Sequence, residues 1–190
     1  MAFARSLRKG DIQKSPSTPK ENGNFILILD DVYDTFNVGG MYRVSDAAGV
    51  TKVYHCGQTP VPPDPKIVRA SVGLVNYIPW EYKQDILALV KSLKVEGYTI
   101  IVLEQNEKSI SIDELGMRMG NVGARHALPV QQNIALISGN ETFGVKQEVI
   151  ELADIVVELP MYGINKSLNV VVSTGIALYE IRRTLSLEDK

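Results

Sequence analysis

The sequence has few or none of several features that mark whole classes of protein. It contains one cysteine, Cys56, among 190 residues, so the chain forms no internal disulfide and offers no cysteine cluster to a metal. Its two histidines, His55 and His126, lack the spacing of metal ligands. No apolar run approaches the ~20 residues of a membrane span. We therefore expect no metal, no membrane and a cytoplasmic location.

Common nucleotide-binding and hydrolase motifs are also missing. No GxGxxG follows the first apolar run, because Gly39 and Gly40 are adjacent and lie inside a helical pattern. This disfavours a Rossmann dinucleotide site and the usual glycine-rich methyltransferase loop. There is no GxxxxGK[ST] phosphate loop and no GxSxG nucleophile elbow.

The sequence does contain apolar runs that alternate with amphipathic segments, within an ordinary globular composition of 45% hydrophobic and 22% charged residues. Alternation of this kind predicts an α/β fold with a mostly parallel sheet and helices on both faces. The expected strands are 25–30, 52–56, 98–103, 133–138 and 155–159, and the expected helices are 37–49, 82–96, 146–152 and 167–185.

The charge is unevenly distributed along the chain. Residues 1–20 carry five basic residues and one acidic residue, so with a total net charge of −2 the remaining 170 residues carry −6. Residues 15–24 (SPSTPKENGN) read as a linker. We therefore divide the chain into a flexible basic arm at 1–24 and a folded domain at 25–190. The arm is either a contact for phosphate or a solvated tail.

Three segments combine polar residues with a strand-to-helix junction. The first is 37–50 (NVGGMYRVSDAAGV), in which Asn37 is expected to cap a helix. Arg43 has the forked geometry that binds a phosphate or a polar reacting group. The alternative for Arg43 is a surface side chain paired with a neighbouring aspartate.

The second segment is 134–145 (IALISGNETFGV), where a buried strand runs into a polar loop. Ligands of open α/β sheets bind at the carboxyl ends of strands, which is where this loop lies. Gly139 would let a ligand approach the backbone, and Glu141 would place a carboxylate at the rim. The alternative is a tight turn with a solvated or helix-capping acid.

The third segment is 155–172 (IVVELPMYGINKSLNVVV), a strand, a loop and the start of a long apolar helix. Ser167 is expected to cap that helix. Asn169 falls in its first turn, where an asparagine is unfavourable unless it is hydrogen-bonded, so it is expected to organise a site. The alternative is a simple cap with an exposed polar side chain.

Together the three segments resemble the SpoU (TrmH-like) family of RNA methyltransferases, within the SPOUT superfamily. The family's motifs occur in order: Asn-x-Gly…Arg at 37, 39 and 43, Gly-Asn-Glu-x-x-Gly-Val at 139–145, and Pro-Met-x-Gly…Ser-Leu-Asn-Val at 160–170. The resemblance covers residues 25–185.

The resemblance implies a sheet with a deep C-terminal trefoil knot and a homodimer with the knot regions at its interface. It also implies that S-adenosylmethionine (AdoMet) binds inside the knot. By motif position the residues around the cofactor would be Leu103, Gly139, Leu159, Met161 and Leu168.

The implied reaction is 2′-O-methylation of a ribose in tRNA or rRNA. The residues assigned to catalysis by the resemblance are Arg43, Glu141, Asn169 and Ser167. A guanidinium is a poor base because its pKa lies far above neutrality, so positioning and charge stabilisation suit Arg43 better. Deprotonation of the 2′-hydroxyl by Arg43 is the second hypothesis for this residue. Residues expected to contact RNA are Asn37, Arg43, Arg118 and Arg125. His126, Lys66 and Arg69 are further candidates for a basic patch on the body of the protein.

Two other functions fit the same motifs. One is a non-catalytic RNA-binding dimer that has kept the knotted fold. The other is a knotted methyltransferase that modifies a base. Intact Arg43, Glu141, Ser167 and Asn169 argue against loss of activity, and the Ser-Leu-Asn motif together with Arg43 favours ribose over base.

Overall fold

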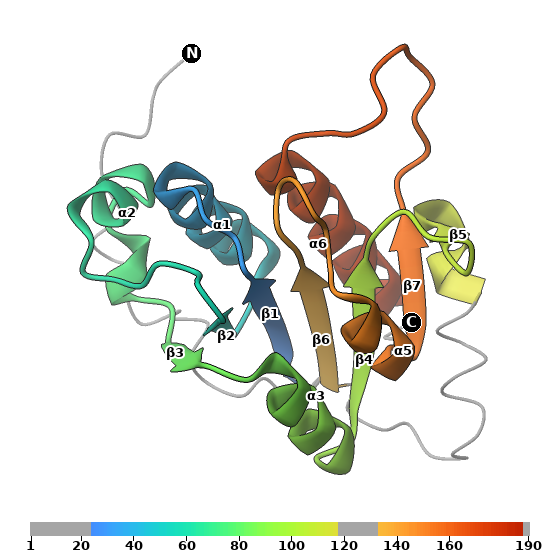
Figure 1. Ribbon diagram of the computed structural model, residues 1–190, viewed down its shortest axis with the longest axis horizontal. Helices are drawn as coiled ribbons and strands as arrows, with labels where there is room; N and C mark the ends of the chain where they lie inside the picture. Colours follow the sequence, from blue (N-terminus) through green and yellow to red (C-terminus); the bar gives the residue numbers. More distant parts are fainter. Residues whose placement is uncertain (1–23, 118–132, 188–190) are drawn as a thin grey trace.

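A seven-stranded sheet runs through the centre of the molecule (Figure 1). The structure, a computed structural model, describes residues 24–117 and 133–187. The strand order is β3-β2-β1-β6-β4-β7-β5, and every pairing between these strands is parallel. The strands are β1 Phe25–Asp30, β2 Lys52–Cys56, β3 Trp80–Lys83, β4 Tyr98–Leu103, β5 Ile110–Ser111, β6 Asn133–Ser138 and β7 Ile155–Glu158. The predicted α/β fold with a mostly parallel sheet is confirmed.

Helices cover both faces of this sheet, as predicted. Among the elements that lie wholly within the described residues, the α-helices are α1 Thr35–Ala48, α2 Pro65–Ala70, α3 Ile86–Val95, α5 Gln147–Leu152 and α6 Val170–Leu187, and short 3₁₀ helices span Leu74–Asn76 and Ile112–Glu114. Helices α1 and α6 pack against each other on one face, while α3 and α5 lie on the other (Figure 1). Among residues 24–117 and 133–187, no helix combines the length and apolar character that crossing a membrane requires.

Strand β1 shows why the central strands read as continuous apolar runs. Leu27 and Leu29 belong to the core beneath α1 and α6. Ile26 and Ile28 belong to the core beneath α3 and α5. Successive side chains of a strand point to opposite faces, so a strand covered on both faces needs apolar residues at every position.

The strand order brings distant segments of the chain together. β6 lies directly beside β1, with Phe25 paired to Ile134 and Leu29 to Ser138. β4 lies between β6 and β7. Because all these strands are parallel, the loops that follow β1, β6 and β7 leave the sheet at the same edge.

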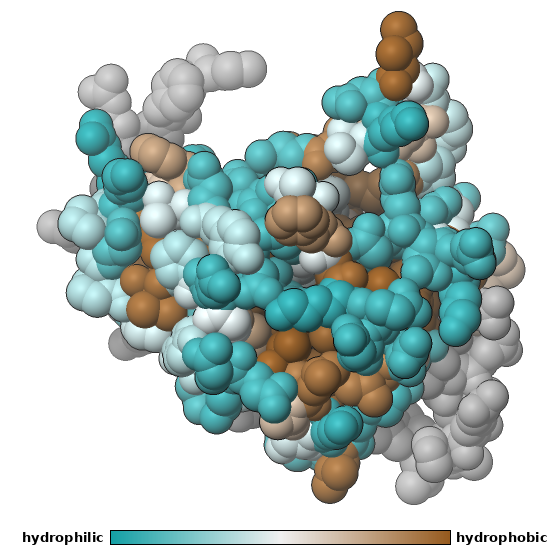
Figure 2. Space-filling model, viewed as in Figure 1, coloured by the Kyte–Doolittle hydropathy of each residue, from teal (hydrophilic) through white to brown (hydrophobic). Residues whose placement is uncertain are grey.

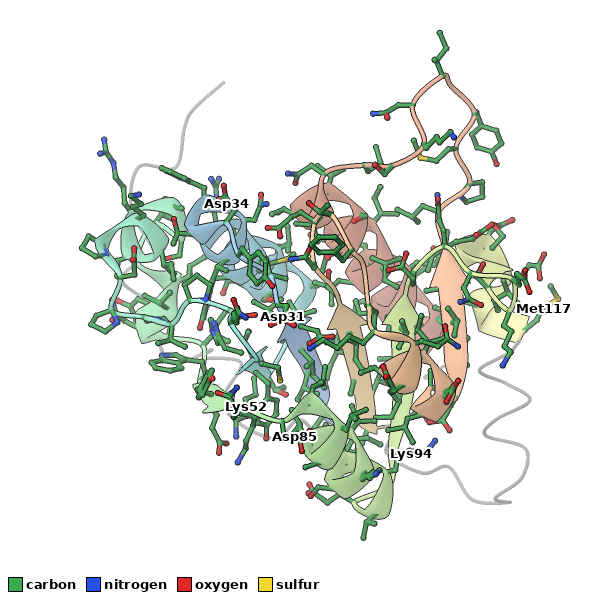
Figure 3. All side chains as sticks on the ribbon, in the orientation of Figure 1. Asp31, Asp34, Lys52, Asp85, Lys94 and Met117 are labelled. Atoms are coloured by element: carbon green, nitrogen blue, oxygen red, sulfur yellow. The ribbon has the colours of Figure 1, made fainter. Side chains whose placement is uncertain are left out.

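The N-terminal end of α1 corrects one expectation. Asp34 is the N-cap, because its side chain accepts hydrogen bonds from the backbone amides of Phe36 and Asn37 (Figure 3). The prediction that Asn37 caps this helix is therefore wrong, since the helix begins two residues earlier, at Thr35. Asn37 lies in the first turn, with its side chain free for other contacts.

The helix expected at 82–96 begins later than predicted. Residues Trp80–Lys83 form the edge strand β3, which pairs with β2 and is tied to it by an ion pair of 2.7 Å between Lys52 and Glu81. Asp85 then caps α3 by accepting from the Ala88 amide (Figure 3). The helical periodicity of the following residues concealed this short strand.

Candidate active site

The three polar segments meet at the carboxyl edge of the sheet. The loop after β1 leads into α1, the loop after β6 contains residues 139–145, and the loop after β7 leads into α6. This last loop projects from the body of the molecule, and Ile164 in it is fully exposed (Figures 1 and 2). The edge is therefore built from segments that lie far apart in the sequence.

A chain of hydrogen bonds joins one residue from each segment. The Asn37 side-chain amide donates to Glu141 Oε1 over 2.9 Å. The Asn169 side-chain amide donates to Asn37 Oδ1 over 3.1 Å. Asn37 is thus the middle member, and it orients the other two. The structure brings together three of the residues singled out from the sequence.

Glu141 is held by donors on three sides. Besides Asn37, the backbone amides of Tyr33 and Asp34 each donate to its carboxylate over 3.2 Å. Burial alone raises the pKa of Glu141, but the hydrogen bond from Asn37 and the backbone amides outweigh burial and hold that pKa below its ordinary value. Glu141 is therefore a fixed carboxylate that acts as an acceptor.

Asn169 has a second role, as the cap of α6. Its Oδ1 accepts from the backbone amides of Val171, at 2.9 Å, and Val172, at 3.4 Å. The helix begins at Val170, so the prediction that Ser167 caps it is wrong. The prediction failed because two residues able to cap stand close together, and Asn169 is the nearer to the first turn. Ser167 instead lines both cavities described below.

The loop after β6 is closed on itself. Asn140 and Gly144 exchange two backbone hydrogen bonds. The Asn140 side chain accepts from the amides of Thr142 and Phe143 and donates to the Asp31 carbonyl. A Cβ added at Gly139 would lie 2.6 Å from the backbone of Gly144. Sequence reasoning missed Asn140, which sits between two residues it singled out.

Two cavities open at this edge. The first has a volume of about 140 Å³, and the second about 380 Å³. The first is lined by four of the five residues predicted to hold a cofactor, namely Leu103, Leu159, Met161 and Leu168. The fifth, Gly139, lines the second cavity, together with Asn37, Glu141 and Asn169. The expected cofactor residues and the hydrogen-bonded chain are thus contiguous.

A further carboxylate lines both cavities. Glu104 follows β4 directly, and its Oε2 accepts from the backbone amide of Val145 over 2.8 Å. It appears in the lining of both spaces, with Leu103, Ser167, Leu168 and Ser173. The sequence carried no signal for Glu104, because one glutamate after a strand has no distinctive spacing.

Arg43 is not part of this cluster in its own chain. It is exposed on α1 and lines neither cavity. It lies six residues beyond Asn37, which turns it about 240° around the helix axis. Within the part of the chain that the structure describes, it has no hydrogen bond or ion pair, so the alternative in which Arg43 pairs with a neighbouring aspartate is not formed.

The other residues expected to contact RNA are only partly placed. Arg118, Arg125 and His126 lie outside the described residues, as does nearly all of the basic arm at 1–24. Lys66 and Arg69 are exposed on α2. Among the described residues, no three or more acidic, cysteine or histidine side chains are grouped so that they could hold a metal ion.

The chain resembles known RNA methyltransferases along most of its length. A curated protein of Bacillus subtilis (strain 168), the 23S rRNA (guanosine(2553)-2'-O)-methyltransferase RlmP, is 31% identical over 157 residues, which are 83% of this chain and 57% of that protein. A tRNA (guanosine(18)-2'-O)-methyltransferase of Aquifex aeolicus (strain VF5) is 29% identical over 168 residues, 86% of this chain and 71% of that protein. The chain thus covers less than two thirds of the first of these relatives.

Solved structures give the same result. The crystal structure of an AdoMet-bound rRNA methyltransferase from Sinorhizobium meliloti superposes with a TM-score of 0.72 and 27% identity, over 87% of this chain and 57% of that one. The A. aeolicus TrmH/SpoU tRNA modifying enzyme shares the fold, with a TM-score of 0.74 over 95% of this chain and 85% of that one. The model of the SpoU rRNA Methylase family matches residues 24–179. The chain belongs to this SpoU family.

Proposed function

We propose that this protein transfers a methyl group from AdoMet to a ribose 2′-hydroxyl in tRNA or rRNA. The observation that carries the proposal is the hydrogen-bonded chain Glu141–Asn37–Asn169 at the mouth of the cavities. It joins the three family motifs into one polar surface beside an apolar cavity. The names of the relatives, which methylate rRNA or tRNA at a 2′-oxygen, support the same reaction.

The lining of the cavities suits AdoMet in both apolar character and charge. Leu103, Leu159, Met161 and Leu168 form an apolar wall that fits an adenine ring. No lysine or arginine of the described residues lines either cavity, whereas Glu104, Glu141 and Glu158 do. Such a lining favours a cofactor with a net positive charge. AdoMet supplies the activated methyl group.

The polar chain has the task of placing the ribose hydroxyl. That hydroxyl is a weak nucleophile, so much of the rate enhancement comes from holding it in line with the methyl carbon while its proton leaves. Glu141 and Asn169 are rigidly oriented through Asn37, and we assign them to orienting the substrate or Arg43. Ser167 supports the loop at the cavity wall.

A guanidinium is a weak base in general, so we assign Arg43 to binding and charge stabilisation in preference to deprotonation of the 2′-hydroxyl. In its own chain Arg43 is exposed and away from the cavities. We propose that the site is completed by the partner subunit's Arg43 in a homodimer.

The outer face of α6 supports a homodimer. Val172, Ile176 and Tyr179 recur at helical spacing on this face and are between 44% and 56% exposed. With Val44 of α1 they line an open apolar groove. Exposed apolar stripes of this kind mark contact surfaces, and a second copy of the chain offers the matching stripe.

The remaining family features are part of the proposal. After β7, at the far side of β4, the chain returns to pack α6 against α1 and β6, and we propose that this return forms the C-terminal trefoil knot. Arg118, Arg125 and the arm at 1–24 are proposed RNA contacts. With tRNA or rRNA as the proposed substrate, we propose a cytoplasmic location.

The direct test is methyl transfer from labelled AdoMet to undermodified total RNA. We expect label in one RNA size class, lost in Arg43→Ala and Asn169→Ala and retained in Lys91→Ala, which removes an exposed charge from α3. The labelled position should resist alkaline cleavage, since a 2′-O-methyl group blocks it. Label at an alkali-sensitive position would indicate a base methyltransferase. Absence of label from all RNA, together with absence of AdoMet binding by the protein, would indicate a non-catalytic dimer.

A further inference from the structure

The carboxylate of Glu104 occupies an unusual position between the two cavities. Its backbone amide donates to the Val157 carbonyl over 3.0 Å, which extends the pairing of β4 with β7 by one residue. Its side chain lines both cavities. The sheet therefore fixes the backbone from which this carboxylate projects.

The side chain is fixed as well. Oε2 accepts from the Val145 amide over 2.8 Å, and Oε1 accepts from the Gln105 amide over 2.9 Å. A Cβ added at Gly144 would lie 2.0 Å from Oε2. Gly144, the second glycine of the Gly-Asn-Glu-x-x-Gly motif, thus leaves room for the Glu104 carboxylate.

The other two carboxylates of the cavities are differently placed. Glu141 is enclosed by Asn37 and two backbone amides. Glu158 accepts from the Ser109 hydroxyl over 2.7 Å and lines only the smaller of these two cavities. Within residues 24–117 and 133–187, no lysine or arginine pairs with Glu104. Among these residues, Glu104 therefore lines both cavities without a basic side chain beside it.

The charge of the cofactor changes during the proposed reaction. As the sulfur–methyl bond breaks and the oxygen–methyl bond forms, the sulfonium becomes a neutral thioether and the ribose hydroxyl releases its proton. AdoMet thus carries one more positive charge than the product, S-adenosylhomocysteine. A fixed carboxylate in the cavity lining binds a cationic ligand more tightly than its neutral counterpart.

We propose that Glu104 is the specificity residue by which the cavity distinguishes the cationic methyl donor from its neutral product. This inference rests on the proposed use of AdoMet. Its consequence is that loss of the methyl group itself weakens binding, so that the spent cofactor leaves and a new donor enters.

The test is isothermal titration of AdoMet and of S-adenosylhomocysteine into the wild type and Glu104→Gln. Glutamine keeps an oxygen for the Val145 amide and removes the charge. We expect the preference for AdoMet over the product to fall about tenfold, as for the loss of one charge–charge contact. An analogue in which a carbon bearing a protonated amine replaces the methylated sulfonium is also cationic. Its affinity should fall in Glu104→Gln by about as much as the affinity of AdoMet.

Two further variants separate charge from structure. Glu148→Gln removes an exposed carboxylate from α5 and should leave the preference unchanged. Glu104→Asp keeps the charge on a shorter side chain and should retain more of the preference than Glu104→Gln. A parallel loss of affinity for donor and product in Glu104→Gln, with their ratio unchanged, would overturn the inference. Failure of the wild type to bind either ligand would instead refute the proposed function.

Discussion

The Asn169 side-chain amide donates a hydrogen bond to the Asn37 side-chain oxygen over 3.1 Å, although 132 residues separate the two. Asn37 uses its own amide group to donate to Glu141. A carboxamide is the side chain that both donates and accepts through adjacent atoms, which the middle position requires. The type of residue at position 37 therefore follows from its two hydrogen-bond partners, Glu141 and Asn169.

Asn37→Asp should break this arrangement at its centre. The new carboxylate cannot donate to Glu141 and places a second negative charge beside it, which raises the pKa of Glu141. We expect the variant to lose about 1–2 kcal/mol of unfolding free energy in urea denaturation. Methyl transfer should fall by roughly a hundredfold or more because the substrate is misplaced. Asn76→Asp, the same change at an exposed position, should affect neither; equal effects in both variants would contradict this account.

Gly144→Ala should be more damaging than its backbone conformation alone explains. Gly144 and Gly97 both have a positive φ, of +68° and +83° respectively. A Cβ added at Gly97 has no atom within 4 Å, whereas a Cβ added at Gly144 collides with the Glu104 carboxylate. Gly97→Ala should cost about 1–2 kcal/mol for the left-handed backbone. Gly144→Ala should cost more and should also weaken AdoMet binding. Adding Glu104→Ala to Gly144→Ala should restore part of the stability, and an absence of coupling in this cycle would show that the contact is unimportant.

Asp30→Asn should stabilise the protein at neutral pH. Asp30 is 1% exposed, and neither carboxylate oxygen has a hydrogen-bond partner in the described structure. Burial raises the pKa of Asp30, and the charge of Lys146 opposes this only in part. With the folded pKa above the unfolded value, stability is highest below the unfolded pKa and is lost as pH rises through the folded pKa.

The increase in unfolding free energy caused by Asp30→Asn should therefore be about 1 kcal/mol at pH 7.5 and should fade towards pH 4. Urea denaturation across this range measures it. Asp113→Asn is a control in which the pH dependence of stability should have the opposite sign, because the Ser111 hydroxyl lowers the pKa of the exposed Asp113 carboxyl. A gain for Asp30→Asn that does not depend on pH would point to packing instead of charge.

Ile176→Asp should separate the proposed homodimer into monomers. Ile176 lies in the apolar groove on α6 and is 44% exposed, and a buried unpaired charge opposes association strongly. Sedimentation velocity should show a monomer that retains its secondary structure but not its methyl transfer. Val95→Asp, at an apolar position on α3 that is 90% exposed, should remain dimeric. A dimeric Ile176→Asp would place the interface elsewhere.

Mixing two inactive variants should restore activity if the partner supplies Arg43. Refolding Arg43→Ala together with Asn169→Ala in equal amounts gives heterodimers in which one of the two sites is intact. The mixture should then recover about a quarter of the wild-type rate, as random pairing in a symmetric dimer requires. A mixture as inactive as its components would show that each chain uses its own Arg43.

The central strands were the most predictable elements. The segments 98–103 and 133–138 match β4 and β6 at both ends, because strands buried on both faces read as uninterrupted apolar runs. Trp80–Lys83 was not predicted, since an edge strand is partly exposed and its residues merge with the helical pattern that follows. Local sequence therefore identifies the interior of the sheet better than its edge.

The site was predictable as a set of motifs but not as a geometry. Asn37, Glu141 and Asn169 were singled out, yet their mutual hydrogen bonds depend on β1 and β6 being neighbours, which no local pattern shows. The caps at Asp34 and Asn169 were misassigned because several residues able to cap stand within a few positions of each helix end. Glu104 and Asn140 became recognisable only through the backbone amides that they bind.

The placement of β6 beside β1 has a consequence for how the chain acquires its structure. Phe25 pairs with Ile134, so the middle of the sheet closes only after more than a hundred intervening residues exist, and contacts of such long range form slowly. A nascent or truncated chain that ends before Asn133 leaves one side of β1 without its partner strand and its apolar residues open to aggregation. The polar surface at the carboxyl edge is then among the last features to assemble, so the proposed binding of AdoMet requires a chain whose synthesis and folding have passed β6.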